Sequence, residues 1–246
     1  MSQTRHAPTA PTYTRRLAAG AMFDRHRHEE HQLVYLSAGA TTITTERGTW
    51  TVPSDRAVFI PAGYWHEHHF YGTATFHTIG FTADVPALQP RVPTVIGVDE
   101  LLRELIVVVA DGGLPDDETA RLRAVIIDRL RRAEPRPLFV PRPRDARLIA
   151  ACQIVERDLE VSIGLEELGR AVGAGGRTLS RLFRTELAMS YPAWRTRARL
   201  AVASVLLAEG VPVSRVALRC GWSTASAFID TYRSHFGSTP GRAVAR

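Results

Sequence analysis

The sequence predicts a multidomain α+β protein with an N-terminal antiparallel β-barrel or sandwich, a helical connector and an all-α C-terminal domain. Between Met22 and Phe81, apolar residues alternate with polar ones and glycine or proline interrupts the pattern, which is typical of many short strands. After Pro93 the apolar residues recur at helical spacing, and from Asp145 onward every segment has the pattern of a short helix. At 246 residues the chain is long enough for two domains, each with its own core.

The same patterns place the elements and the boundaries. Short strands are expected at residues 31–36, 41–45, 50–52, 57–60 and 75–81. Two amphipathic helices are expected at 99–110 and 116–132, separated by Asp-Gly-Gly-Leu-Pro. We therefore divide the chain into a flexible N-terminus (1–20), a β-domain (21–97), a helical connector (98–134), a proline-rich linker (135–144) and a helical domain (145–246).

Charge is distributed unevenly along the chain. All 31 basic residues are arginine, 25 residues are acidic, and the formal net charge is +6. Residues 142–246 contain 16 arginines and 9 acidic residues, a net charge of +7, whereas residues 1–141 contain 15 and 16, a net charge of −1. A basic helical domain has the sign expected of a protein that binds a polyanion. An arginine-rich coding bias would give the same charge, so charge alone does not establish that the helical domain binds a polyanion.

Composition also bears on location. No apolar run approaches the roughly 18 residues that a membrane-spanning helix requires, and residues 1–16 lack the apolar segment of a secretory signal. Cys152 and Cys220 lie far apart in helical patterns, which favours buried free thiols over a disulfide. We expect a cytoplasmic protein with no membrane partner.

The helical domain contains two segments with the pattern of a helix-turn-helix. In the first, at about 165–187, a short helix ends at Gly173, which can adopt the positive φ of a tight turn. The apolar residues of the next helix all fall on one face. Its opposite face presents polar side chains, namely Arg177, Ser180, Arg181 and Arg184. In a helix-turn-helix, such a face of the second helix enters a DNA major groove.

The pattern recurs at about 212–236, with a turn at Cys220-Gly221 and an N-cap at Ser223 or Thr224. A longer helix, capped by Ser190 and continuing to about Ala208, joins the two units. Its length of about 28 Å approaches the roughly 34 Å between successive major grooves on one face of DNA. The spacing suggests two recognition helices in adjacent grooves.

Several motifs in this domain resemble the AraC/XylS family of bacterial transcription regulators over about 100 residues. They are Leu168-Gly-Arg-Ala-Val-Gly, Arg177-Thr-Leu-Ser-Arg-Leu-Phe, Ala193-Trp-Arg, Ala217-Leu-Arg-Cys-Gly-Trp and a closing Phe236-Gly-Ser-Thr-Pro. The resemblance implies binding of double-stranded DNA and dimerisation through the connector, and contact with RNA polymerase if the protein activates transcription; activation and repression both stay open. It also implies DNA-binding positions, which are Arg177, Ser180, Arg181 and Arg184 in the first unit and Ala225, Ser226, Asp230 and Arg233 in the second.

Two positions depart from the family pattern. Gly175-Gly176 replaces the usual Ser-Pro at the start of the first recognition helix, which removes a good cap. Asp230 stands where the family commonly has arginine, and a carboxylate repels phosphate but accepts a hydrogen bond from cytosine N4. The second unit is therefore expected to be weaker or different in specificity. Phosphate contact or simple solvation remains the alternative role for each of these arginines.

Eight of the nine histidines precede residue 78. The segments His26-Arg-His28-Glu-Glu-His31 and Pro61-Ala-Gly-Tyr-Trp-His66 resemble the two motifs of a cupin barrel. His26 and His28, two residues apart on one strand, face the same side, and His66 joins them from a facing strand. Converging imidazoles suit Zn, Fe, Mn or Ni. Glu30 and His31 both fall near the family's carboxylate position, and the expected metal set is His26, His28, His31 and His66.

Two other roles for these histidines stay open. Cupin domains of such regulators often bind an organic effector without metal, in which case Tyr64, Trp65 and His68 would line the pocket. The histidines can also be purely structural. The sequence thus predicts a transcription regulator, not an enzyme, that senses a small molecule or a metal ion. The alternative is a metal-dependent cupin enzyme, a dioxygenase or isomerase, with a vestigial DNA-binding domain.

Overall fold

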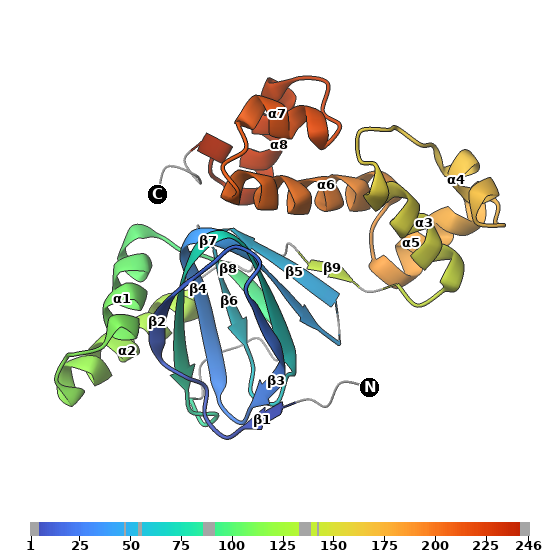
Figure 1. Cartoon of the computed structure of the whole chain (residues 1–246). Helices are drawn as coiled ribbons and strands as arrows, with labels where there is room; N and C mark the ends of the chain where they lie inside the picture. The colour runs from blue at the N-terminus through green and yellow to red at the C-terminus, as the bar shows by residue number, and fades with distance from the viewer. Residues whose placement is uncertain are drawn as a thin grey trace.

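The computed structural model describes residues 5–46, 48–53, 56–85, 92–132, 139–141 and 143–241. A curled β-sheet with two helices on its flank is followed by a helical domain (Figure 1). The strands are β1 Arg5–Ala7, β2 Tyr13–Leu17, β3 Met22–His28, β4 His31–Thr45, β5 Gly48–Pro53, β6 Arg56–Ile60, β7 His66–Phe81, β8 Thr94–Gly97 and β9 Phe139–Pro141. The helices are α1 Glu100–Asp111, α2 Asp116–Arg132, α3 Ala146–Arg157, α4 Leu165–Ala171, α5 Gly176–Leu187, α6 Tyr191–Ala208, α7 Val213–Arg219 and α8 Ala225–Phe236.

The sheet is organised around two long strands, β4 and β7, which pair antiparallel along most of their length. β4 also pairs with β5 and β6, and β7 also pairs with β2 and β3. The separate strands expected at 31–36 and 41–45 are one strand, because register shifts around Ala38 absorb the interruption. Gly39, with φ +80°, supplies the backbone conformation that this irregularity needs.

The expected flexible N-terminus is wrong for the part that the structure describes. β2 pairs with β7 from Tyr13 to Leu17, and Leu17 is buried. β1 pairs parallel with β3. The segment between them is held by the backbone N–H of Ala10, which donates to the Glu30 carboxylate at 3.0 Å. β2 is a short strand whose partner residues, Ala74–Thr78, lie far along the chain.

The proline-rich linker is also partly ordered. Phe139–Pro141 forms β9, which pairs with β5 at the sheet edge. Arg144 is held by the carboxylate of Glu186, which accepts a hydrogen bond from its backbone N–H at 2.6 Å. The rest of the expected linker lies outside the described residues, except Pro143.

The connector helices pack against the sheet and leave one face exposed. Asp99 caps α1 by accepting from the N–H of Leu102 at 2.9 Å, and it also pairs with Arg129 of α2. Buried apolar side chains of both helices, Leu102, Ile106, Val109, Ala110, Ile126 and Leu130, join a core with the sheet residues Leu33, Tyr35, Phe59 and Ile79. Leu101, Val108 and Val125 remain 52%, 41% and 41% exposed. Most apolar side chains of α1 and α2 therefore pack within the chain, and these three remain on the surface.

The helical domain has two cores that share α6. One core joins α3, α4 and α5 to the start of α6 around Phe183 and Trp194, and the other joins the end of α6 to α7 and α8 around Phe228 and Tyr232. The expected caps are present. Ser190 Oγ accepts from the N–H of Ala193 at 3.4 Å, and Thr224 Oγ1 accepts from the N–H of Ala227 at 3.1 Å.

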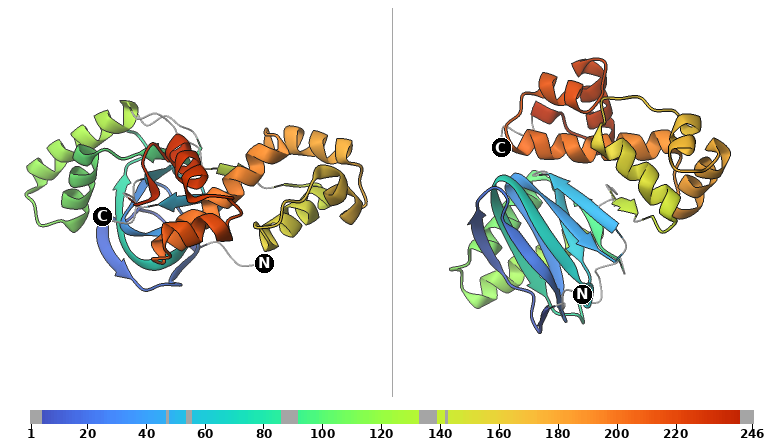
Figure 2. Two further views of the ribbon diagram at one scale, coloured as in Figure 1. Left: turned by 90° about the horizontal axis from the view of Figure 1, so that it is seen from above. Right: turned by 45° about the vertical axis from the view of Figure 1, so that its right-hand side comes forward.

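Helix α6 lies across one end of the barrel, with the two helical units at its ends (Figures 1 and 2). Gly72 of β7 contacts the carboxyl end of α6 so closely that a Cβ on Gly72 would lie 2.3 Å from the Ala208 carbonyl oxygen. Among the described residues, no helix is both long and apolar enough to cross a membrane. Cys152 and Cys220 are buried and form no disulfide.

Candidate functional site

The first candidate recognition helix is α5, which buries one face and exposes a basic one. Leu179, Leu182 and Phe183 are buried against the rest of the domain. On the opposite face, Arg177, Arg181 and Arg184 are exposed and Ser180 is half-buried. Within the described part of the chain, these three guanidinium groups have no hydrogen-bond or ion-pair partner. They are therefore free to meet an external anion.

The start of α5 is capped from another helix. Gly175 offers no capping side chain, as its sequence indicates. Glu166 of α4 supplies the missing acceptor, because its carboxylate accepts from the N–H of Gly176 at 3.3 Å. A Cβ on Gly176 would lie 2.4 Å from the same carboxylate, so the glycine makes room for this contact. The departure from Ser-Pro is compensated by an interhelix cap.

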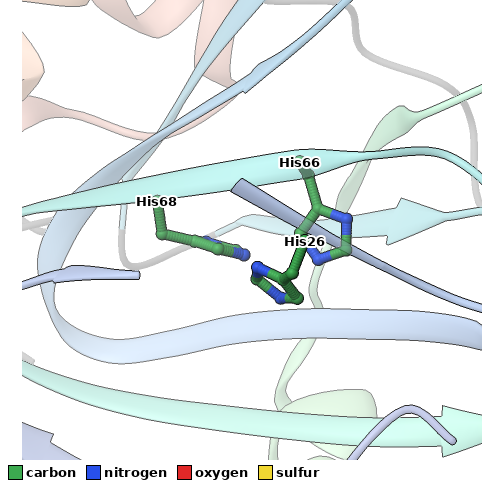
Figure 3. A group of neighbouring side chains, drawn as sticks. All are labelled: His26, His66 and His68. Carbon is green, nitrogen blue, oxygen red and sulfur yellow. The ribbon is translucent and has the colours of Figure 1, made fainter. Parts of the chain in front are cut away.

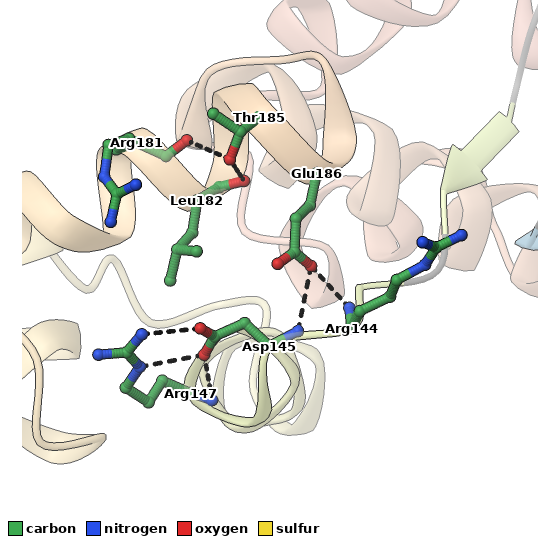
Figure 4. Close-up of polar contacts among 7 residues, drawn as sticks. All are labelled: Arg144, Asp145, Arg147, Arg181, Leu182, Thr185 and Glu186. Carbon is green, nitrogen blue, oxygen red and sulfur yellow. Dashed lines mark hydrogen bonds and ion pairs between the residues drawn. The ribbon is translucent and has the colours of Figure 1, made fainter.

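The other end of α5 is tied to α3 (Figure 4). Glu186 accepts from the backbone N–H groups of Arg144 and Asp145 at 2.6 and 3.1 Å. Asp145 in turn pairs with Arg147 at 2.7 Å, and hydrogen bonds from Arg147 lower the pKa of Asp145 to about 2. With both of its ends held in this way, α5 is a rigid support for its arginines.

The second candidate recognition helix, α8, is less basic. Ser226, Asp230 and Arg233 are exposed, whereas Ala225 is half-buried against the domain core. Arg233 forms an ion pair with Asp230 at 3.3 Å, one helical turn away. The two charges offset each other on this surface. The spacing of three residues between Asp230 and Arg233 in the sequence is the signal that could have predicted this pair.

The two candidate helices lie at opposite ends of α6, whose 18 residues span about 27 Å. A continuous helix with a buried face toward both units holds them at a fixed separation.

A second site is formed by histidines inside the barrel. His26 of β3 pairs in register with His66 of β7, and His68 follows two residues later on the same face of β7. Between Phe23 and His26 the register of β3 against β7 shifts by one residue. The side chains of Phe23 and His26 therefore both face the interior, although the two residues are three positions apart. One nitrogen from each of His26, His66 and His68 lies within 4.8 Å of the others (Figure 3).

Backbone carbonyls fix the orientation of two of these rings. His26 Nδ1 lies 2.7 Å from the Asp24 carbonyl, and His66 Nδ1 lies 3.1 Å from the Tyr64 carbonyl. A carbonyl only accepts, so Nδ1 carries the proton and Nε2 of each ring has a free lone pair. His66 Nε2 and both nitrogens of His68 are buried without a hydrogen-bond partner among the described residues.

The environment keeps these imidazoles neutral. Burial lowers the pKa of His66 to about 3 and that of His28 to about 4, and it lowers the pKa of His68 well below its usual value. Burial also lowers the pKa of His26, against a hydrogen bond from its ring to the Asp24 carbonyl. Neighbouring imidazoles add to the shift at His28, His66 and His68. At neutral pH, the cluster is a set of lone-pair donors.

The expected metal set is only partly brought together. His28 lies beside the cluster, with its ring centroid 5.0 Å from that of His26 and 5.5 Å from that of His66. His31 is not part of the cluster, so its expected role as a ligand is wrong for this geometry. Its Nδ1 instead accepts from the N–H of Ala62 at 2.9 Å, and its ring packs against Phe59.

Two other residues, Glu30 and His68, also differ from their expected roles. Glu30, the alternative to His31, holds the N-terminal segment through Ala10. His68, expected in an effector pocket, belongs to the histidine cluster itself; its spacing of two from His66 was the signal that could have found it. Tyr64 and Trp65 are half-buried beside the cluster, and the Arg25 guanidinium lies 3.7 Å from the centre of the Trp65 ring.

Two family models match the chain: a helix-turn-helix domain over residues 168–246 and a cupin domain over residues 13–80. Together with the fold, these matches define the class of protein as a helix-turn-helix regulator with an N-terminal cupin domain. The chain is similar to AraC-type transcription regulators in both of these domains.

The relatives agree with this assignment. The HTH-type transcriptional regulator NimR of Escherichia coli is 28% identical over 224 residues, which cover 90% of this chain and 82% of NimR. The arabinose operon regulatory protein of Escherichia coli is 25% identical over 74% of this chain and 60% of that protein. ToxT from Vibrio cholerae, a solved structure, aligns over 96% of this chain and 98% of its own at 9% identity with a TM-score of 0.41, and it adds nothing to the assignment.

Proposed function

We propose that the protein is a sequence-specific transcription regulator in which α5 and α8 enter adjacent major grooves and an effector in the barrel controls their binding. The observation that carries this proposal is the exposed, unpaired arginine face of α5 on a helix held at both ends. Arginine forks bind guanine and phosphate in a bidentate manner. The ion pair of Asp230 with Arg233 gives α8 less charge for phosphate, so α5 supplies most of the affinity.

Dimerisation, activation and location belong to the same proposal. The exposed Leu101, Val108 and Val125 of the connector offer an apolar face to a second copy of the chain. The effector is a small molecule or a metal ion, and action on DNA places the protein in the cytoplasm, where activation would involve RNA polymerase. The relatives are transcription regulators, and we propose that this chain likewise has no enzymatic activity.

Fluorescence anisotropy with labelled DNA from upstream of the protein's own gene tests this function. Arg177→Ala and Arg181→Ala should each weaken binding by about 1–3 kcal/mol if the side chain contacts a base, and relax the preference at that position. Arg121→Ala removes the same charge from the connector, where Arg121 pairs with Asp117, and it should leave DNA binding unchanged. Equal losses in all three variants, or no preference over scrambled DNA, would refute the proposal.

A further inference from the structure

We propose that the barrel binds a divalent transition-metal ion through His26, His66 and His68, and that this ion is the effector. The regulatory half of the inference rests on the proposed function, whereas the binding site stands on the geometry of the barrel alone.

The geometry brings three nitrogen donors from two paired strands to one point. The donor atoms lie within 4.8 Å of one another. Imidazole nitrogens bound to one zinc ion at 2.0–2.1 Å in a tetrahedron are about 3.3 Å apart. Coordination of one ion therefore requires the donor atoms to approach one another by up to about 1.5 Å. Figure 3 shows the three rings converging from β3 and β7.

Two of the three rings are held in a defined tautomer. The carbonyls of Asp24 and Tyr64 occupy Nδ1 of His26 and His66, which is the arrangement that orients a histidine ligand and raises its basicity. His68 is wholly buried among aromatic rings, yet neither of its nitrogens has a hydrogen-bond partner among the residues described. Buried polar atoms are nearly always paired. A histidine that serves only to fill this core would leave two such atoms unsatisfied, and a bound ion would satisfy one of them.

The donor set selects the class of ion. The described residues that converge here are all histidines; Glu29 pairs with His6 at 3.1 Å, Glu30 accepts from Ala10, and Asp24 acts on His26 through its charge without joining the group. Neutral imidazoles without carboxylates favour zinc, copper or nickel over magnesium and calcium, which prefer oxygen. His28 lies next to His26 and is the nearest further imidazole for a fourth coordination position.

The position of the site also provides a connection to the DNA-binding domain. Two of the three donors are on β7, and four residues beyond His68 the same strand contacts the end of α6 through Gly72 and Ala208. Helix α6 joins both recognition units. An ion that draws β3 and β7 together would therefore act on the strand that contacts the helix between the two units.

Metal binding is tested directly on the full-length chain. The protein is freed of metal with a chelator and titrated with Zn²⁺ against a chromophoric competitor, and X-ray absorption of the zinc-loaded sample identifies the ligands. We expect one tight zinc per chain with a nitrogen-only shell of imidazoles. His68→Phe and His26→Ala should each weaken binding by more than about 100-fold, because loss of a ligand exceeds the usual cost of disturbing an outer-shell contact.

Matched controls separate the site from other histidines. His69→Phe changes the neighbouring residue on the opposite face of β7, and His31→Ala removes the histidine outside the cluster; both should bind zinc as the native chain does. Weak zinc binding, or tight binding that survives both His68→Phe and His26→Ala, overturns the site. If zinc binds as expected but does not alter DNA affinity, the ion is not the effector. Failure of DNA binding in every metal state would instead refute the proposed function and leave the site intact.

Discussion

The burial of His68 makes the stability of the metal-free protein sensitive to acid. His68 is wholly buried among Phe23, Phe70 and Phe76, and burial holds its pKa well below 6.5. In the unfolded chain the same imidazole titrates near 6.5. Below that pH the unfolded state binds a proton that the folded state does not, so the free energy of unfolding falls as the pH falls.

The size of this effect follows from the distance to the unfolded pKa. At pH 5.0 the solution is 1.5 pH units below 6.5, and each unit is worth 1.36 kcal/mol, so one such histidine costs at most about 2 kcal/mol relative to pH 7.5. His68→Phe replaces the imidazole with a ring of similar shape that does not titrate. We expect the variant to lose up to about 2 kcal/mol less stability than the native chain between these two pH values.

Urea unfolding of the metal-free full-length chain, at pH 7.5 and pH 5.0, measures this difference. His69→Phe is the control, because His69 lies on the other face of the same strand and is partly exposed. The control should show the acid sensitivity of the native chain. An equal loss of stability in His68→Phe and in the native chain would show that His68 is solvated or protonated when folded, and the account of the cluster would fail.

Three further predictions concern the connector, a helix end and the contact between domains. Val108→Asp should convert a dimer into a 27.2 kDa monomer in light scattering, and a native chain that is already monomeric would contradict dimerisation through this face. Ala188 ends α5 with φ 54°, a left-handed conformation, so Ala188→Gly should raise the free energy of unfolding by about 1 kcal/mol; a loss would contradict this. Gly72→Ala should separate β7 from Ala208, leaving zinc affinity unchanged while abolishing the effect of zinc on DNA binding; a retained effect excludes this contact as the route.

Helices were predictable from the sequence where their periodicity and their caps agree. The connector helix expected at 116–132 is α2, with the same bounds. Ser190 and Thr224 cap α6 and α8 as expected, because N-capping depends on residues within one turn. The interhelix cap from Glu166 to Gly176 was not predictable, since it depends on how α4 and α5 pack.

The sheet and its histidines were less predictable because strand pairing is long-range. β2 pairs with residues about 60 positions away, and its own residues do not show which partner it has. The register shift after Phe23 changes which side chains of β3 face inward, so alternation along the whole strand does not predict the cluster. His31 lies one strand away from the donors despite its proximity to His28 in sequence.

We propose that DNA binding is sequence-specific and controlled from the barrel. Anisotropy titration of the full-length chain with its own upstream DNA, at about 100 mM salt and with the protein either zinc-loaded or metal-free, tests it most directly. Specific binding should exceed binding to scrambled DNA by about 10³-fold or more in one metal state. The specific affinity should differ at least fivefold between the two states, the lower end of typical allosteric coupling. Equal affinity for both DNAs would contradict the specificity, and equal affinity in both metal states would contradict control by the ion.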